Sequence, residues 1–151
     1  MQEGTGAGFP SLADDPLLTS YPKPMPNADS LDTPLGEVLI LARVDGEPRT
    51  NVPHLVQNHA NGAFDWGARS GPSADLALNA VEFFVREMDE VGEGKRVECL
   101  EGEIDRLTWR LYPYFLVDFL EEVPPRGGRI GSGEIREWIR GRPLVGEANV
   151  R

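Results

Sequence analysis

The segment from Phe64 to Pro72 constrains the local fold more than any other feature of the chain. It reads Phe-Asp-Trp-Gly-Ala-Arg-Ser-Gly-Pro and runs directly into a stretch with helical apolar spacing. This order predicts a strand end, a glycine-rich turn and a helix start. Ser70 and Gly71 both suit the N-cap, and Pro72 suits the first helical position, where no backbone N–H is needed. We interpret the segment first as a simple connection between a strand and a helix.

The same turn is also a candidate ligand site. Backbone N–H groups at the start of a helix can hold an anion or a carboxylate. The residues that would form this site are His59, Trp66, Gly67, Arg69, Ser70 and Gly71. His59, Asp65 and Asp75 would make an acid–base set if their turns converged. We favour a hydrogen bond from His59 that stabilises a turn, and we predict no catalytic residues.

Neither a metal nor a cofactor is expected. His54, His59 and Cys99 are the soft or borderline ligands, and they lack the paired spacing of a metal site. The glycine turn is not followed by the Gly-Lys-Ser/Thr of a P-loop. Cys99 is the single cysteine, so it cannot form an internal disulfide, and we expect it to act as a small apolar filler.

The pattern of the remaining chain predicts an α+β fold with a small antiparallel sheet. Branched apolar residues predict a strand over 37–44, and Asp45-Gly46 is a hairpin-turn signal. A second strand is expected over 50–56, interrupted at Pro53, and a third over 63–66. The sheet should pack against two longer helices and a short C-terminal helix.

The helices are predicted from apolar spacing. The first covers 74–91, and an acidic connection over 92–102 follows it. The second covers 104–123 and should kink or restart at Pro113. A turn is expected over 126–130, and Ser132 should cap a final helix over 133–139.

Three tryptophans are present, and we expect two of them to fill the core, with the core favoured for each one taken singly. They are Trp66, Trp109 and Trp138. A tryptophan left exposed would instead be a candidate interface anchor.

Residues 1–36 differ from the rest of the chain. They contain six prolines, several glycines and little periodicity, which predicts an extended arm that cannot form a core alone. The arm carries spaced apolar residues that would serve as interaction anchors: Phe9, Leu12, Leu17, Leu18, Tyr21 and Met25. We therefore divide the chain into this arm (1–36), an α+β domain (37–141) and a C-terminal tail (142–151).

Charge limits the classes of partner. The net charge is −10, which disfavours non-specific binding of nucleic acid, and no apolar run is long enough to cross a membrane. Thirteen arginines against two lysines, on an acidic chain, fit salt adaptation or a GC-rich genome. A basic patch of five arginines is an alternative to a solvated helix face that pairs with Glu134 and Glu137; they are Arg126, Arg129, Arg136, Arg140 and Arg142. The N-terminus shows no signal peptide, so we expect a cytoplasmic protein or one assembled into a virion.

Several motifs together resemble an uncharacterised family of small proteins from bacteria, archaea, phages and plasmids. These are Asn58-His59, the aromatic-x-Trp-Gly turn with Ser70-Gly71-Pro72, and Glu-Ile-x-x-Trp at 134–138. The resemblance covers about residues 38–140. It implies a fold rather than an activity, and the long arm and Pro113 depart from the family pattern.

Three functions remain open at this point. The leading prediction is a non-catalytic interaction or structural protein, part of a virus particle or accessory complex, which docks on a protein partner through its arm. The second is an acidic anti-defence inhibitor that imitates nucleic acid, which needs acids at regular spacing on one face. The third is a small enzyme or nucleotide-binding domain that uses the turn at Gly67–Pro72.

Overall fold

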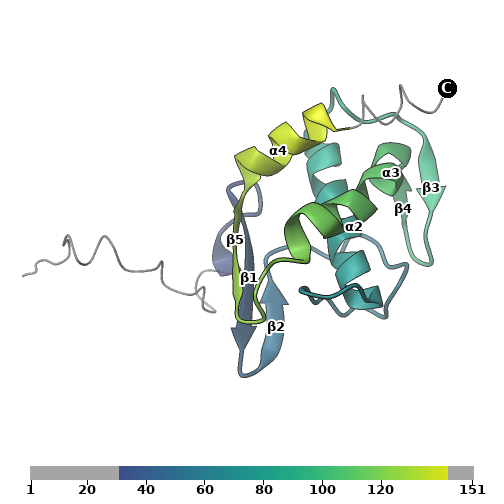
Figure 1. The fold of residues 1–151 in the computed structure, drawn as a ribbon. Coiled ribbons are helices and arrows are strands. Elements are labelled where there is room, and N and C mark those ends of the chain that lie inside the picture. The colour runs from purple at the N-terminus through teal and green to yellow at the C-terminus, as the bar shows by residue number, and fades with distance from the viewer. Residues whose placement is uncertain (1–30, 143–151) are drawn as a thin grey trace, which may run out of the picture.

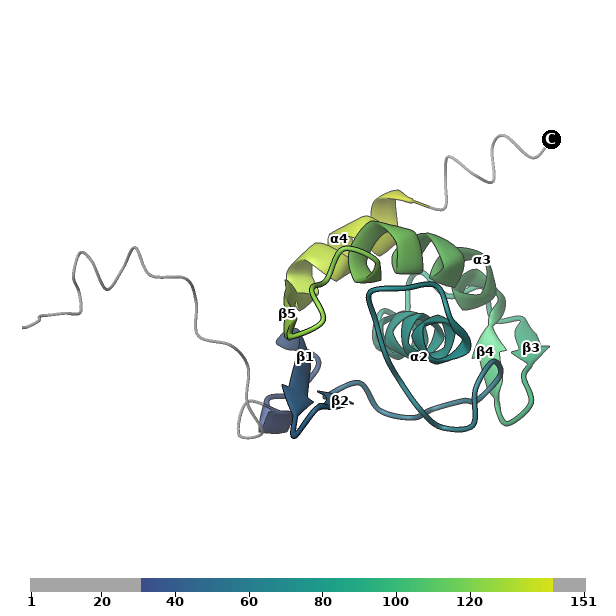
Figure 2. The ribbon, with the colours of Figure 1, turned by 60° about the horizontal axis from the view of Figure 1, so that its bottom comes forward.

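The computed structural model describes residues 31–142, which form an α+β fold with three α-helices and small antiparallel sheets (Figures 1 and 2). This confirms the predicted fold class. In chain order the elements are β1 (Val38–Val44), β2 (Glu47–Thr50), α2 (Gly71–Glu87), β3 (Arg96–Glu98), β4 (Glu103–Asp105), α3 (Arg106–Phe115), the π-helix η3 (Leu116–Leu120), β5 (Gly127–Gly131) and α4 (Ser132–Gly141).

The larger sheet has the strand order β2-β1-β5, and both pairs are antiparallel. The predicted hairpin turn joins β1 to β2. Asp45 and Gly46 there have φ of 53° and 80°, the left-handed values that a two-residue hairpin turn needs. β1 is central because four consecutive side chains, from Leu39 to Ala42, are fully buried.

The predicted second strand was misplaced. β2 covers Glu47–Thr50, and the residues predicted as strand after Thr50 leave the sheet. Asn51 ends the pairing, because its side-chain amide takes the place of a backbone partner: Ile40 N donates to its Oδ1 at 2.9 Å, and its Nδ2 donates to Val38 O at 2.8 Å. The chain then winds around α2, which Figure 2 shows nearly end-on. Residues 63–66, predicted as a strand, also lie in this irregular segment.

The third strand is β5, which replaces the turn predicted over 126–130. Glycine-rich sequence is a poor strand signal, but here close approach requires it. Gly127 has a φ of 107°, and a Cβ on it would lie 2.1 Å from Leu41 O. Pairing with β1 therefore selects glycine at this position.

Helix α2 forms the centre of the core. Its N-cap is Ser70, one of the two positions that the sequence offers, and the helix runs from Gly71 to Glu87 rather than over 74–91. Apolar residues on several sides of the helix are fully buried, including Leu76, Val81 and Phe84. They pack in one cluster with residues of β1, α3 and α4.

The second predicted helix begins two residues later than expected. Ile104 lies in β4, which pairs with β3 inside the segment predicted as a connection. Helix α3 continues through Pro113 and becomes the π-helix η3 at Leu116, where Glu121 N donates to Leu116 O. The helix therefore does not restart at Pro113, and its type changes only three residues later, at Leu116.

The final helix is α4, but Ser132 does not cap it. The N-cap is Gly131, and Ser132 Oγ instead donates to Leu35 O at 2.5 Å. Ser132 is fully buried, so this bond joins the start of α4 to the segment before β1.

Candidate functional site

The predicted ligand turn leads into α2 through a helix cap in which Ser70 and Ser73 bond to each other. Ser73 N donates to Ser70 Oγ at 3.2 Å, and Ser70 N donates to Ser73 Oγ at 2.9 Å. These reciprocal bonds form a capping box and use the N–H groups of Ser70 and Ser73, two of those that an anion at this helix start would contact. Pro72, in the same turn, contributes no N–H.

The glycines of this turn lie against the rest of the chain. Gly67 has a φ of 90°, and its N–H donates to Leu120 O at 3.2 Å. A Cβ on Gly71 would lie 2.5 Å from His59 O. The turn is therefore closed by backbone, and glycine is required there for close approach.

The charged and aromatic side chains of the turn contact other elements. Trp66 is buried, and its Nε1 donates to Pro124 O at 2.9 Å. Arg43 lies over the indole ring at 4.8 Å and forms an ion pair with Asp65 at 2.9 Å. Arg69 forms an ion pair with Glu121, and this hydrogen bond raises the pKa of the arginine.

His59 is directed toward α3 rather than toward the turn. Its Nε2 lies 2.9 Å from Tyr112 Oη, and its backbone N–H donates to Asp75 Oδ1 at 2.8 Å. The structure therefore does not bring His59 together with Arg69, nor His59 and Asp75 with Asp65 as an acid–base set. A cavity of about 300 Å³ lies elsewhere, lined by His54, Leu55, Val56, Gln57, Glu101 and Gly102.

The sequence analysis did not identify a row of buried polar side chains on α2. Asp75 accepts hydrogen bonds from the N–H groups of Asn58, His59 and Ala60 at 2.8–3.3 Å. One turn later, Asn79 accepts from Leu55 N and Val56 N, and its Nδ2 donates to two backbone carbonyl groups. These two side chains hold the segment that winds around α2.

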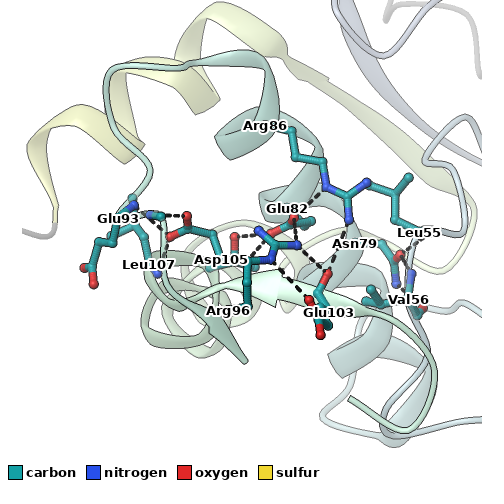
Figure 3. Close-up of polar contacts among 12 residues, drawn as sticks. Leu55, Val56, Asn79, Glu82, Arg86, Glu93, Arg96, Glu103, Asp105 and Leu107 are labelled. Carbon is teal, nitrogen blue, oxygen red and sulfur yellow. Dashed lines mark hydrogen bonds and ion pairs between the residues drawn. The ribbon is translucent and has the colours of Figure 1, made fainter. Parts of the chain in front are cut away.

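The row continues with Glu82, which is fully buried (Figure 3). Its Oε1 accepts from Asp105 N at 3.0 Å and from Thr108 Oγ1 at 2.7 Å. Its Oε2 accepts from Arg86 Nε at 2.6 Å, and Arg96 lies 3.6 Å away. Each oxygen therefore has a partner, which offsets the cost of burying the charge.

Asp105 extends this network to the smaller sheet. Its carboxylate accepts from the N–H groups of Glu93, Gly94 and Leu107 at 2.8–3.0 Å, and so it caps α3 and fixes the loop before β3 (Figure 3). The signal in the sequence was the spacing of Asp75, Asn79 and Glu82, which places three polar groups on one side of an otherwise apolar helix. All of their oxygens are engaged with the protein's own groups.

Two weakly acidic groups lie beside this row. Burial raises the pKa of the Cys99 thiol, and the carboxylates of Asp75 and Glu82 raise it further. Burial and Asp75 also raise the pKa of Tyr112. Both groups are thus held in their neutral forms, which is opposite to the activation that a nucleophilic cysteine needs.

The outer side of α3 and η3 carries apolar residues that the sequence analysis did not place there. Trp109, Tyr114 and Val117 are 39%, 52% and 40% exposed, and Pro113 is exposed between them. We call these four residues the α3–η3 apolar face. Trp109 was predicted to lie in the core, and that prediction was wrong. Trp66 is buried as predicted, and Trp138 packs partly buried between the rings of Phe115 and Phe119.

The predicted arginine patch consists largely of ion pairs with other elements. Arg136 pairs with Glu87 at 3.0 Å and Arg140 with Glu90 at 3.4 Å, both near the C-terminal end of α2. Arg142 lies 3.6 Å from Asp118 and stacks over Tyr114 at 4.5 Å. We expected these arginines to pair with Glu134 and Glu137 of the same helix. The structure shows one such contact, between Arg140 and Glu137 at 4.0 Å.

The predicted interaction anchors of the arm lie outside the described residues. They are Phe9, Leu12, Leu17, Leu18, Tyr21 and Met25. Within residues 31–142, no three His, Cys, Asp or Glu side chains are grouped as metal ligands. None of the helices in that range has the length and apolar character needed to cross a bilayer.

No protein-family model, curated protein or solved structure matches this chain. The resemblance to the family of small phage, plasmid and prokaryotic proteins therefore stays a prediction from the motifs alone.

Proposed function

We propose that this protein is a non-catalytic interaction protein that joins a larger assembly, with its N-terminal arm as the attachment element. The phage and plasmid associations of the resembling family suggest a virus particle or an accessory complex as that assembly. A protein partner, rather than nucleic acid or a small molecule, is the ligand that we infer.

The observation that supports this proposal is the α3–η3 apolar face. Large apolar side chains that remain exposed together on one helix mark interaction surfaces, and tryptophan and tyrosine are the residues most enriched at binding hot spots. Trp109, Pro113 and Val117 follow at four-residue spacing, which places them along one side of α3 and η3, and Tyr114 is exposed next to them in the chain.

The inhibitor hypothesis receives less support from the charges. A nucleic-acid mimic presents its carboxylates to solvent at regular spacing. Here Asp75, Glu82 and Asp105 are buried, and further acids pair with arginines from other elements.

The enzyme or nucleotide-binding hypothesis receives less support from the turn. It requires an open pocket above Gly67–Pro72 with His59 and Arg69 directed into it. The contacts of Gly71 with His59 O, and of Arg69 with Glu121, fill that position with the protein's own groups.

The proposal is tested by the mass of the protein in solution. Light scattering on a preparation from the native source should give an assembly well above the 16.6 kDa of one chain. A full-length variant with Leu17→Ser and Tyr21→Ser, expressed in the same source, should be lost from that assembly. The proposal is contradicted if this variant enters the assembly as fully as the unmodified protein.

A further inference from the structure

We propose that the α3–η3 apolar face is the acceptor site for the N-terminal arm of a second copy of this chain, with residues 9–18 as the docking segment. This inference rests on the proposed function, and it names both the partner and the surface. Three independent features support it: the apolar residues of the arm and of the face, the charges beside them, and the length of the arm.

The composition of the two surfaces is complementary. The face presents Trp109, Pro113, Tyr114 and Val117 along α3 and η3. From Trp109 to Val117 a helix rises about 12 Å. An extended segment from Leu12 to Leu17 spans about 16 Å, so its two apolar ends match the two ends of the face.

Charge is complementary as well, although the whole chain is acidic. Asp14 and Asp15 lie between Leu12 and Leu17 in the arm. On α3, Arg106 is exposed one turn before Trp109, whereas Arg142 at the other end of the face already pairs with Asp118. The arm's carboxylates would therefore meet the Arg106 guanidinium group beside Trp109, and charge pairs of this kind help to set register at interfaces.

Reach favours a second copy over the same chain. The described chain begins beside β1, and in both views this end lies away from α3 (Figures 1 and 2). Residues 19–30 span at most about 40 Å when fully extended. A domain of this size is about 35 Å across, so a path over its surface to the far side is about 50 Å. The arm is too short for that path on its own domain, whereas docking on a neighbouring copy does not require it.

Docking in this manner is head-to-tail. Each copy would donate an arm and accept another, which produces a closed ring or an open chain of copies. Self-association of the pure protein should therefore rise with concentration and continue beyond a dimer unless a ring closes.

The test uses the full-length chain, with association followed by sedimentation and light scattering. A face variant, Trp109→Ser with Val117→Ser, should weaken self-association at least about tenfold, as expected for loss of a hot-spot residue. An arm variant, Leu12→Ser with Leu17→Ser, should weaken it similarly. Leu100→Ser is the matched control, because Leu100 is 74% exposed but lies outside the face, and it should leave association unchanged.

Charge exchange tests the same contact without removing apolar residues. Asp14→Arg with Asp15→Arg should weaken association, as should Arg106→Glu, and the three substitutions together should restore most of it. This is more specific than added salt, which would screen both the local attraction and the general repulsion between acidic chains.

The outcomes separate this inference from the proposed function. Loss of association in the arm variant, but not in the face variant, would overturn the inference and leave the arm as the attachment element. A pure protein that remains monomeric up to high concentration would overturn the inference alone, if the arm is still needed in the native assembly. Assembly that ignores the arm in both settings would overturn both.

Discussion

At the scale of single residues, buried carboxylates with complete sets of donors determine how the loops are held. Asp75 receives three backbone N–H groups, and Glu82 receives a hydroxyl, a backbone N–H and a guanidinium group. Such side chains cost little when every partner is present and much when one is lost. Their importance for stability should therefore exceed that of the exposed ion pairs.

Asp75→Asn keeps the size of the side chain but replaces an acceptor oxygen with an NH₂ donor, which would face backbone N–H groups. We expect the free energy of unfolding to fall by about 2–3 kcal/mol in urea denaturation. Glu90→Gln is the control, because Glu90 is largely exposed in its ion pair with Arg140, and it should change stability by less than about 1 kcal/mol. Equal effects would contradict the role assigned to the buried row.

The Cys99 thiol offers a second test at this scale, since it is the single cysteine of the chain. Burial and two carboxylates raise its pKa, so the thiolate should appear only at higher pH than in an unfolded chain. The pH profile of alkylation by iodoacetamide should be displaced to higher pH in the folded protein and return to the ordinary position in urea. Identical profiles in the two states would refute the shielding of this group. Because the folded pKa is raised, this group's contribution to stability is present below the unfolded pKa and is lost as pH rises through the folded pKa.

At the scale of elements, strand β5 shows how pairing overrides local preference. Its glycines favour a turn, yet Gly127 allows the backbone of β5 to approach β1 where no side chain fits. Helix α4 follows directly and carries a glycine of a different kind, because a Cβ on Gly133 meets nothing within 4 Å.

Gly127→Ala and Gly133→Ala should therefore act in opposite directions. The first combines a left-handed φ with a backbone clash and should destabilise the protein by more than about 2 kcal/mol. The second places alanine in the first turn of α4 and should stabilise it by up to about 1 kcal/mol. Thermal or urea unfolding of both variants measures this, and two changes of the same sign would be inconsistent with the pairing of β5 on β1.

At the scale of the whole molecule, net charge dominates over individual ion pairs. Each exposed pair contributes little, whereas a charge of −10 repels itself over the entire surface. The excess of acids with almost no lysine fits salt adaptation or a GC-rich genome, and the physical consequence of this net charge concerns stability.

Raising NaCl from about 10 mM to about 500 mM should raise the midpoint of thermal unfolding, because the Debye length falls from about 30 Å to under 10 Å and long-range repulsion is screened. The change should be larger than for the same protein with several exposed acids neutralised, for example Glu98→Gln, Glu101→Gln and Glu122→Gln. A midpoint that falls with salt would mean that the arginine–carboxylate pairs outweigh the repulsion.

The sequence by itself determined the features that depend on local chemistry. A helix cap at Ser70 or Gly71, Asp45-Gly46 as a hairpin turn and the first strand all follow from backbone geometry or from hydrogen bonds between near neighbours. Apolar spacing also determined the α+β class. These properties need no knowledge of distant residues.

Tertiary structure alone decided the rest, because distant groups supply the partners. Gly127 becomes part of a strand only against Leu41, and Trp109 is exposed only because the inner side of α3 packs on α2. Likewise, the candidate turn is closed by groups from elsewhere in the chain. His59 O lies against Gly71, and Glu121 pairs with Arg69. Burial and pairing across the chain therefore decide which side chains remain available to a partner.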